Sequence, residues 1–252
     1  MFTPSTLRAM LAGLALASAA AMADEVSVAV AANFTAPFKQ IATDFEKDTG
    51  HKLVASFGST GKFYAQIRNG APFELLLAAD DATPARLIQE NAAVAASQFS
   101  YAIGKLVLWS AKPGVVDPAG EVLKRGSFQH IALTNPQLAP YGAAAVQTLQ
   151  ALGVYDRLAP RFVTAETTVQ AYQFISSGNS PLGFVALSQV LKDGQIEGSA
   201  WVVPADLYTS IRQNAVILNK GRDKPGATAF MNYLQGPKAR AVIRGFGYGI
   251  EQ

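Results

Sequence analysis

Four short segments of the chain combine small residues with Asn, Ser or Thr at points where an apolar run gives way to helical spacing. They are residues 31–35 (AANFT), 56–62 (SFGSTGK), 135–142 (NPQLAPYG) and 165–170 (AETTVQ). Each is expected to lie between a strand and a helix, where it presents free backbone N–H groups and the positive end of a helix dipole. Small residues let an anion approach such a backbone closely. The shared pattern therefore indicates an anion site made of neutral donors.

Plain helix capping is the simpler interpretation of any one of these segments, because Asn, Ser and Thr are the commonest caps. Ser59 and Thr60 carry the stronger signal, since their turn supplies both side-chain and main-chain donors. A phosphate loop is excluded there. Only two residues separate Gly58 from Gly61, and Phe63 stands where that motif has Ser or Thr.

Catalytic chemistry has few candidates in this sequence. The chain has no cysteine, which excludes disulfides, thiolate metal sites and cysteine nucleophiles. Its two histidines, His51 and His130, lie outside all four segments. An exported hydrolase with Ser59 or Thr60 as nucleophile is an alternative, but it lacks a neighbouring base. We therefore expect a binding protein and no enzyme.

The composition is that of a globular protein. Its 252 residues are 50% hydrophobic and 15% charged, with a net charge of +3. The basic residues are scattered, so binding to nucleic acid is not expected. Asp80 and Asp81 are expected to cap a helix rather than hold a metal. Lys62 could bind an anion, but a lysine one turn into a helix more often lies over the surface. The tail at 245–249 (GFGYG) is expected to form a turn packed on the body.

The first 23 residues have the features of a secretory signal peptide. Arg8 precedes an apolar stretch over 9–20, and Ala21-Met22-Ala23 forms a typical cleavage site. A membrane anchor is the alternative, but the apolar stretch is short. No later stretch reaches the ~18 consecutive apolar residues of a membrane helix. The exported protein is then expected to comprise residues 24–252.

From residue 26 onward, strand and helix patterns alternate. Strands are expected at 26–30, 53–57, 73–78, 106–109, 130–133, 182–185, 201–203 and 215–218. Helices are expected around 38–45, 63–67, 83–92, 142–152, 167–176, 225–235 and 237–244. Such alternation predicts an α/β fold with mainly parallel sheets flanked by helices.

The order of these segments resembles the periplasmic molybdate-binding proteins of ABC transporters over essentially all of residues 24–252. The shared landmarks are the turns at 31–35 and 56–60, then 70–72 before 78–80, 135–136 with 140–142, 181–183 and 236–237. The resemblance implies a type II periplasmic-binding-protein fold with the ligand cleft between two lobes. One lobe would comprise 24–104 with 213–252, and the other 105–212.

The resemblance also implies how the ligand is held. Molybdate or tungstate would be bound through its oxygens, with no direct metal coordination and no cofactor, by Asn33, Ser59, Thr60, Tyr141, Thr168 and Val169. The partner would be the membrane permease of the transporter, and the protein would be a periplasmic monomer. Because the two oxyanions are nearly equal in size, the sequence does not separate them. A protein of the same fold that binds sulfate or an organic anion is the other open interpretation.

Three positions depart from the usual pattern of that family. Asn33 replaces Ser, and is expected to donate through its amide as well as its backbone N–H. Thr168 replaces an aliphatic residue, but its N–H is the expected donor, with Val169 as the adjacent candidate. Ala186 stands where many members have a ligand-binding tyrosine, whereas Tyr141 replaces a small residue. We expect the Tyr141 hydroxyl to reach the same ligand oxygen from a different turn.

Overall fold

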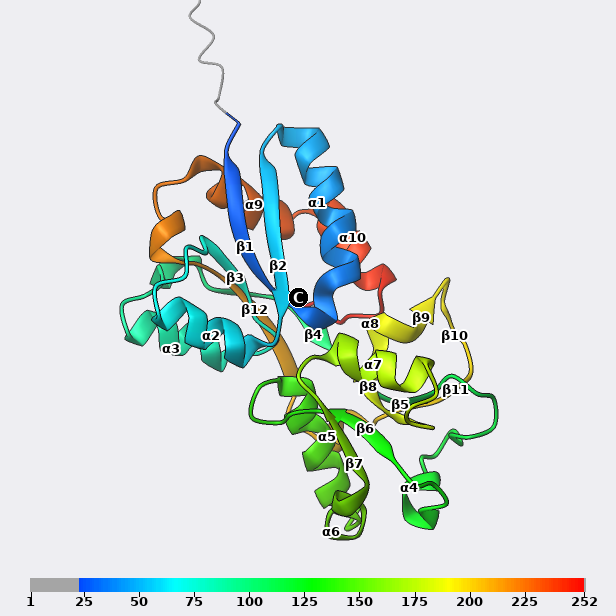
Figure 1. Cartoon of the computed structure of the whole chain (residues 1–252). Helices are drawn as coiled ribbons and strands as arrows, with labels where there is room; N and C mark the ends of the chain where they lie inside the picture. Colours follow the sequence, from blue (N-terminus) through cyan, green and yellow to red (C-terminus); the bar gives the residue numbers. More distant parts are fainter. Residues whose placement is uncertain (1–22, 252) are drawn as a thin grey trace, which may run out of the picture.

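The chain folds into two lobes, each with a five-stranded sheet covered by helices on both faces (Figure 1). The computed structural model describes residues 23–251, so the predicted signal peptide lies outside the described residues except for Ala23. Within that range, no helix is both long enough and apolar enough to cross a bilayer. The expected two-lobed α/β fold is confirmed.

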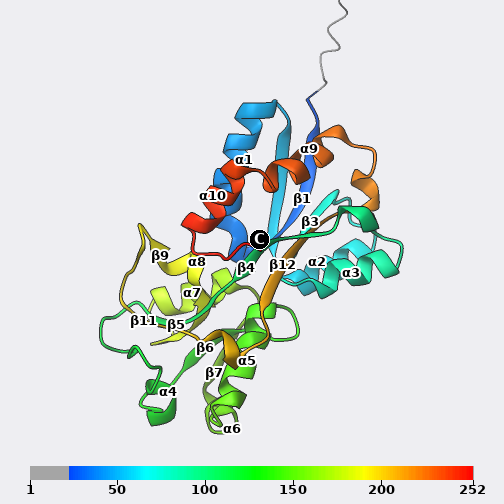
Figure 2. The same ribbon diagram turned by 180° about the vertical axis from the view of Figure 1, so that it is seen from behind.

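The first lobe is built on a sheet with the strand order β2-β1-β3-β12-β4. Its strands are β1 (Glu25–Ala31), β2 (Lys52–Gly58), β3 (Leu75–Leu77), β4 (Phe99–Gly104) and β12 (Ile211–Ile217). Side chains alternate between the two faces, so Val28 and Val30 join one core cluster and Ala29 another. The first cluster is covered by α1 (Thr35–Thr49), α9 (Pro225–Leu234) and α10 (Pro237–Gly245), and the second by α2 (Thr60–Arg68) and α3 (Ala82–Gln89) (Figures 1 and 2).

The second lobe is built on a sheet with the order β11-β5-β8-β6-β7. Its strands are β5 (Leu106–Ser110), β6 (Ile131–Thr134), β7 (Phe162–Ala165), β8 (Gly183–Ala186) and β11 (Ser199–Val202). One face is covered by α4 (Val122–Arg125), α5 (Pro140–Ala151) and α6 (Tyr155–Leu158), and the other by α7 (Thr168–Ser176) and α8 (Leu187–Val190). A short antiparallel hairpin joins β9 (Leu191–Lys192) to β10 (Gln195–Ile196).

Short 3-10 helices occur at several connections of the chain. They are η1 (Ala32–Phe34), η2 (Ala95–Ser97), η3 (Ala159–Arg161), η4 (Ala205–Leu207) and η5 (Asn219–Gly221). Of these, η1 matters for function, because it leads directly from the end of β1 into α1 and carries the first polar segment of the sequence.

Both sheets are mixed, whereas the sequence pattern indicated mainly parallel sheets. β12 runs antiparallel to β3 and β4, and β5 runs antiparallel to β8 and β11. The other strand pairs within these two sheets, β1 with β2 and β3, and β6 with β7 and β8, are parallel. β5 and β12 are the strands that follow the two crossings between lobes. Each of these two strands begins at the junction between the lobes. It therefore runs opposite to its neighbouring strands, which end at the junction.

Candidate functional site

A small cavity lies where the carboxyl ends of β1 and β2 face the ends of β6 and β7 across the two lobes. Its walls are residues 31–33, 58–60 and Ala79 from the first lobe, and 139–141 and 167–168 from the second. All four polar segments of the sequence therefore meet at one place. None of these lining residues is charged.

Most of the predicted contact residues line this cavity. They are buried, with 2 to 4% of their surface exposed: Asn33, Ser59, Thr60, Tyr141 and Thr168. Val169 is not among the lining residues and is only half-buried, as the second residue of α7. The structure thus brings five of the six residues together, and their contact with a ligand stays a prediction.

Two hydroxyl groups on opposite walls have no hydrogen-bond partner. Within residues 23–251, the Ser59 Oγ and Thr168 Oγ1 atoms are fully buried and unpaired. Ser59 is the N-cap residue of α2, yet its side chain does not cap that helix. At α7 the capping role falls to Thr167, whose Oγ1 accepts from the Gln170 N–H at 3.1 Å. Because buried polar groups are stabilised by hydrogen bonding, these two hydroxyls are available to donate to a ligand between the lobes.

The Thr60 hydroxyl is oriented by its own neighbour. Its Oγ1 accepts a hydrogen bond from the Ala79 N–H at 3.0 Å. A hydroxyl that accepts in this way still carries a proton to donate. The side chain therefore supplies a donor whose direction is set before any ligand arrives.

Helix starts supply backbone donors on both sides of the cavity. α2 begins at Thr60, α5 at Pro140 and α7 at Thr168. The first N–H groups of a helix have no partner inside it. Gly142 lets α5 start this close to the end of β6, since a Cβ there would lie 2.1 Å from the Thr134 carbonyl oxygen. A backbone bond from the Gly61 N–H to the Leu138 carbonyl, at 3.0 Å, links α2 directly to the second lobe.

The amide group of Asn33 does not have the free donors that the sequence suggested. Its Nδ2 donates to Gln213 Oε1 at 2.8 Å and to Tyr248 Oη at 3.0 Å. Both amide hydrogens are thereby engaged within the protein. Neighbours far away in sequence satisfy both amide hydrogens here, so donation from the Asn33 side chain to a ligand stays a prediction. The backbone N–H of Asn33, in the first turn of η1, is the other donor that this residue can offer.

The Tyr141 hydroxyl adjoins these side chains, and we call Asn33, Gln213, Tyr248, Tyr141 and Ser188 together the polar cluster. Its Oη accepts from Gln213 Nε2 at 3.4 Å, across the two lobes. Gly104 makes room for it, since a Cβ at that position would come within 2.2 Å of the phenol oxygen. Burial raises the pKa of Tyr141 well above its usual value, so the phenol stays protonated. Ala186, the position at which the resemblance implied a tyrosine in many members, is fully buried in the core of the second lobe.

The sequence reasoning did not find three members of this cluster. Gln213 on β12, Tyr248 after α10 and Ser188 on α8 are all buried. The Tyr248 and Ser188 hydroxyl oxygens lie 2.8 and 3.0 Å from the Asn33 carbonyl oxygen and 2.8 Å from each other. One of the two hydroxyls therefore donates to the carbonyl and the other to its neighbouring hydroxyl. The GFGYG tail contained the only hint, a tyrosine in a segment otherwise rich in glycine.

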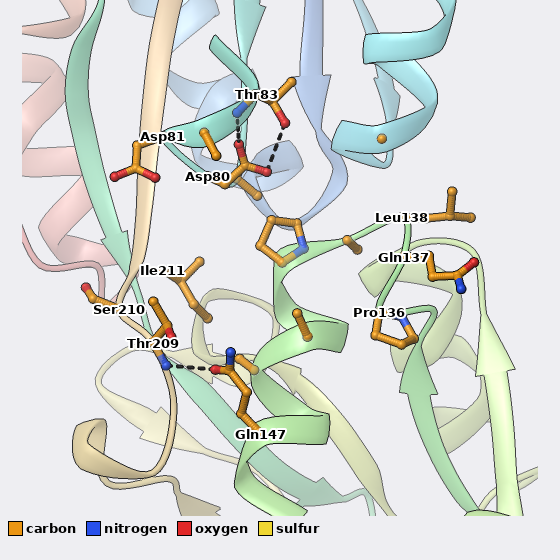
Figure 3. Close-up of a pocket in the computed structure, with 17 residues that line it drawn as sticks. Asp80, Asp81, Thr83, Pro136, Gln137, Leu138, Gln147, Thr209, Ser210 and Ile211 are labelled. Carbon is orange, nitrogen blue, oxygen red and sulfur yellow. Dashed lines mark hydrogen bonds between the residues drawn. The ribbon is translucent and has the colours of Figure 1, made fainter. Parts of the chain in front are cut away.

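A larger cleft of different character adjoins the cavity. It shares Ala79, Ala139 and Pro140 with the cavity and is lined further by acidic and polar residues (Figure 3). The Asp80 carboxylate accepts from the Thr83 N–H at 2.7 Å and from its hydroxyl at 3.2 Å, so Asp80 caps the first turn of α3 as expected. Asp81, the N-cap residue of α3, makes no side-chain capping bond, so the expectation is wrong for this residue. Burial raises the pKa of Asp80. Asp81 is exposed beside it.

The charged and imidazole groups lie away from the cavity. Lys62 pairs with Glu166 of the second lobe at 2.5 Å, with both side chains exposed. His51 precedes β2 and His130 precedes β6, at the strand ends opposite to the cavity. The His51 Nδ1 accepts from the Asp24 N–H at 3.0 Å. Neither histidine can therefore serve as a base for Ser59 or Thr60.

Comparisons with known proteins agree with this architecture. A family model described as bacterial extracellular solute-binding protein matches residues 26–249. The molybdate-binding protein ModA of Azotobacter vinelandii is 59% identical over 240 residues, with 95% of each chain covered. ModA of Rhodobacter capsulatus is 49% identical over 251 residues, with 98% of each chain covered.

A solved structure gives the same result in three dimensions. The periplasmic molybdate-binding protein of Azotobacter vinelandii matches with a TM-score of 0.88 and 46% identity, covering 90% of this chain and 100% of that chain. These relatives are named as binding proteins, not enzymes. The chain belongs to the bacterial extracellular solute-binding proteins, within the family of the ModA proteins.

Proposed function

We propose that this protein captures molybdate, and equally tungstate, in the cavity between its lobes and delivers it to an ABC transporter. The observation that carries the proposal is the pair of unpaired hydroxyls, Ser59 Oγ and Thr168 Oγ1, on opposite walls of one uncharged cavity. The names of the relatives support the choice of ligand.

The proposed donors take the place of the countercharge that a buried dianion would otherwise need. Burying such an ion in an idealised low-dielectric medium costs tens of kcal/mol. Each hydrogen bond to a charged group returns about 1.5–3 kcal/mol, and each helix end adds roughly 0.3–1 kcal/mol. The proposed donors are the hydroxyls of Ser59, Thr60 and Thr168 and the backbone N–H groups of Asn33, Thr60, Tyr141 and Thr168.

A cavity made of donors discriminates by protonation state. Hydrogen phosphate carries a proton that needs an acceptor, whereas molybdate and tungstate are unprotonated near neutral pH. We therefore expect phosphate to be rejected. Molybdate and tungstate should bind alike, because they match in charge and nearly in size. Sulfate is smaller, so only the volume of the closed cavity would exclude it.

We further propose that residues 24–104 with 213–252 and residues 105–212 move as two bodies that close over the ion. Since donors come from both bodies, the ligand stabilises the closed state. Residues 1–23 would direct export to the periplasm, where the protein acts as a monomer and docks on the membrane permease.

Calorimetric titration with molybdate, tungstate, sulfate and phosphate at neutral pH tests the proposal. We expect similar tight binding of the first two and no measurable binding of phosphate. Molybdate should also raise the melting temperature in proportion to its excess over the dissociation constant. Tight phosphate binding, or a melting temperature unmoved by saturating molybdate, would contradict the donor-only site between the lobes. Preference for sulfate would favour the alternative ligand.

A further inference from the structure

The last residues of the chain pass between the two lobes. We call residues 246–251 the C-terminal strap; Figures 1 and 2 both show the chain reaching the junction of the lobes there. Gly249 exchanges two backbone hydrogen bonds with Ile103 of β4, at 2.7 and 2.9 Å. The Glu251 carboxylate accepts from Arg212 of β12 at 2.9 Å. The strap thus contacts both strands at which the chain crosses between lobes.

The strap also packs on the second lobe. Gly247 has a φ of +83°, and a Cβ at this position would lie within 3 Å of the Leu187 and Leu191 side chains. Leu187 begins α8, the helix that also carries Ser188. Glycine is required here both for the backbone angle and for the close approach to α8. This approach brings the next residue, Tyr248, into the polar cluster.

Tyr248 links Asn33 of the first lobe to Ser188 of the second. Only 5% of its surface is exposed, and its ring meets Phe34 edge-on at 5.5 Å. Its hydroxyl oxygen accepts from Asn33 Nδ2 at 3.0 Å, and it lies 2.8 Å from both the Asn33 carbonyl oxygen and Ser188 Oγ. Because each hydroxyl has one proton, one of the two donates to the Asn33 carbonyl and the other to its neighbouring hydroxyl. The Tyr248–Ser188 pair therefore holds Asn33 on both its backbone and its side chain.

We propose that Tyr248 is a positioning residue of the anion site, which fixes the Asn33 turn fully only when the lobes are closed. Asn33 and Tyr248 belong to the first lobe, and Ser188 belongs to the second. The Ser188 contacts with the Tyr248 hydroxyl and with the Asn33 carbonyl form only when the lobes meet. Closure thereby completes the hydrogen bonds that hold the Asn33 N–H at the cavity wall.

This inference rests on the proposed function, because it concerns how the same site is organised. A donor that is held in place before binding loses less conformational freedom when the ligand arrives. The Ser188–Tyr248 link should therefore contribute to ligand affinity. It should contribute little to the stability of the ligand-free protein in its open state. That difference separates a positioning role from a merely structural one.

The test is a double-mutant cycle of Tyr248→Phe and Ser188→Ala in the full-length mature protein, with molybdate as ligand. Tyr248→Phe keeps the ring against Phe34 and removes only the hydroxyl. We expect each single change to weaken molybdate binding about tenfold and the double change to weaken it by much less than a hundredfold. Chemical unfolding of the ligand-free variants should show additive effects, with no coupling between the two positions.

The matched control is Tyr233→Phe. The Tyr233 hydroxyl donates to Asp48 Oδ2 at 2.9 Å on the surface of the first lobe, remote from Ser188. This variant should bind molybdate as the wild type does. Unchanged affinity of Tyr248→Phe, or coupling of equal size in the unfolding of the ligand-free protein, would overturn the positioning role. If the wild type itself binds no anion, the proposed function falls and this inference with it.

Discussion

The cavity between the lobes and the larger cleft beside it are neighbours, but their walls differ in chemistry. They share three wall residues, yet the cavity is lined by neutral groups and helix starts, whereas the cleft carries Asp80 and Asp81. A dianion in the cleft would face carboxylates, which repel it. The smaller space is the better anion site because its donors are unopposed by charge. Size alone would favour the cleft, whereas the chemistry of the walls favours the cavity.

The largest effect should come from making the cavity resemble the cleft. Ser59→Asp places a carboxylate among the donors, and like charges brought together cost several kcal/mol. We expect molybdate affinity to fall by about a thousandfold or more. Asp81→Asn, in the cleft, should leave affinity within about threefold of the wild type, since exposed charges are screened. Titration of the three proteins would falsify the assignment if Ser59→Asp still bound normally.

The next effect concerns the unpaired hydroxyls. Thr168→Val and Ser59→Ala each remove one donor, and each should cost about ten- to a hundredfold in affinity. Because neither hydroxyl has a partner within the part of the chain that the structure describes, the melting temperature of the ligand-free variants should stay level or rise. The variants should therefore lose affinity without losing stability. A variant that folded poorly would instead lose both affinity and melting temperature.

Thr134→Val is the control for this pair. The Thr134 Oγ1 atom is likewise buried and unpaired, but it does not line the cavity. We expect its loss to leave molybdate binding unchanged. An equal loss of affinity in this variant would mean that such hydroxyls act through the fold rather than at the ligand.

A moderate effect is expected from Tyr141→Phe. The change leaves Gln213 Nε2 without its acceptor across the lobes, in addition to any bond lost to the ligand. We expect about a tenfold loss of affinity, equivalent to roughly 1.4 kcal/mol. A calorimetric titration measures it. Wild-type affinity would show that only the backbone N–H of residue 141 contributes to the site.

The smallest effect is expected at the exposed ion pair between Lys62 and Glu166, outside the cavity. Lys62→Gln or Glu166→Gln breaks the exposed ion pair between the lobes, and such pairs contribute about 0–1 kcal/mol. Affinity should change by no more than about fivefold at low salt, and the difference should vanish near 1 M salt, where the Debye length is about 3 Å. A large effect that persists at high salt would instead place Lys62 at the ligand.

The element pattern could be predicted well where apolar spacing was regular. Phe38, Ile41 and Phe45 predicted α1, and all three are buried. β4 and β7 were missed, because Phe99–Gly104 mixes half-buried with buried positions and Phe162–Ala165 has only one buried position, so neither shows a clear alternation. The direction of β12 was also not predictable, since an apolar run carries no information on which way a strand runs.

The sequence by itself determined the class of chemistry at the site. Asn, Ser and Thr occur at four predicted helix starts, where they offer neutral hydrogen-bond donors. The chain has no cysteine, and both histidines lie outside these segments, so the sequence favoured binding by neutral donors over catalysis. These are local properties, because a helix start exposes its N–H groups wherever it lies.

Only the tertiary structure decided which of these groups are free. Asn33 meets Ser188, Gln213 and Tyr248, which lie 155, 180 and 215 positions away in the chain. No spacing rule connects residues at such separations. They meet because two crossings and the C-terminal strap bring both lobes to one junction, and hydrogen bonds formed there use some donors and leave others unpaired for a ligand.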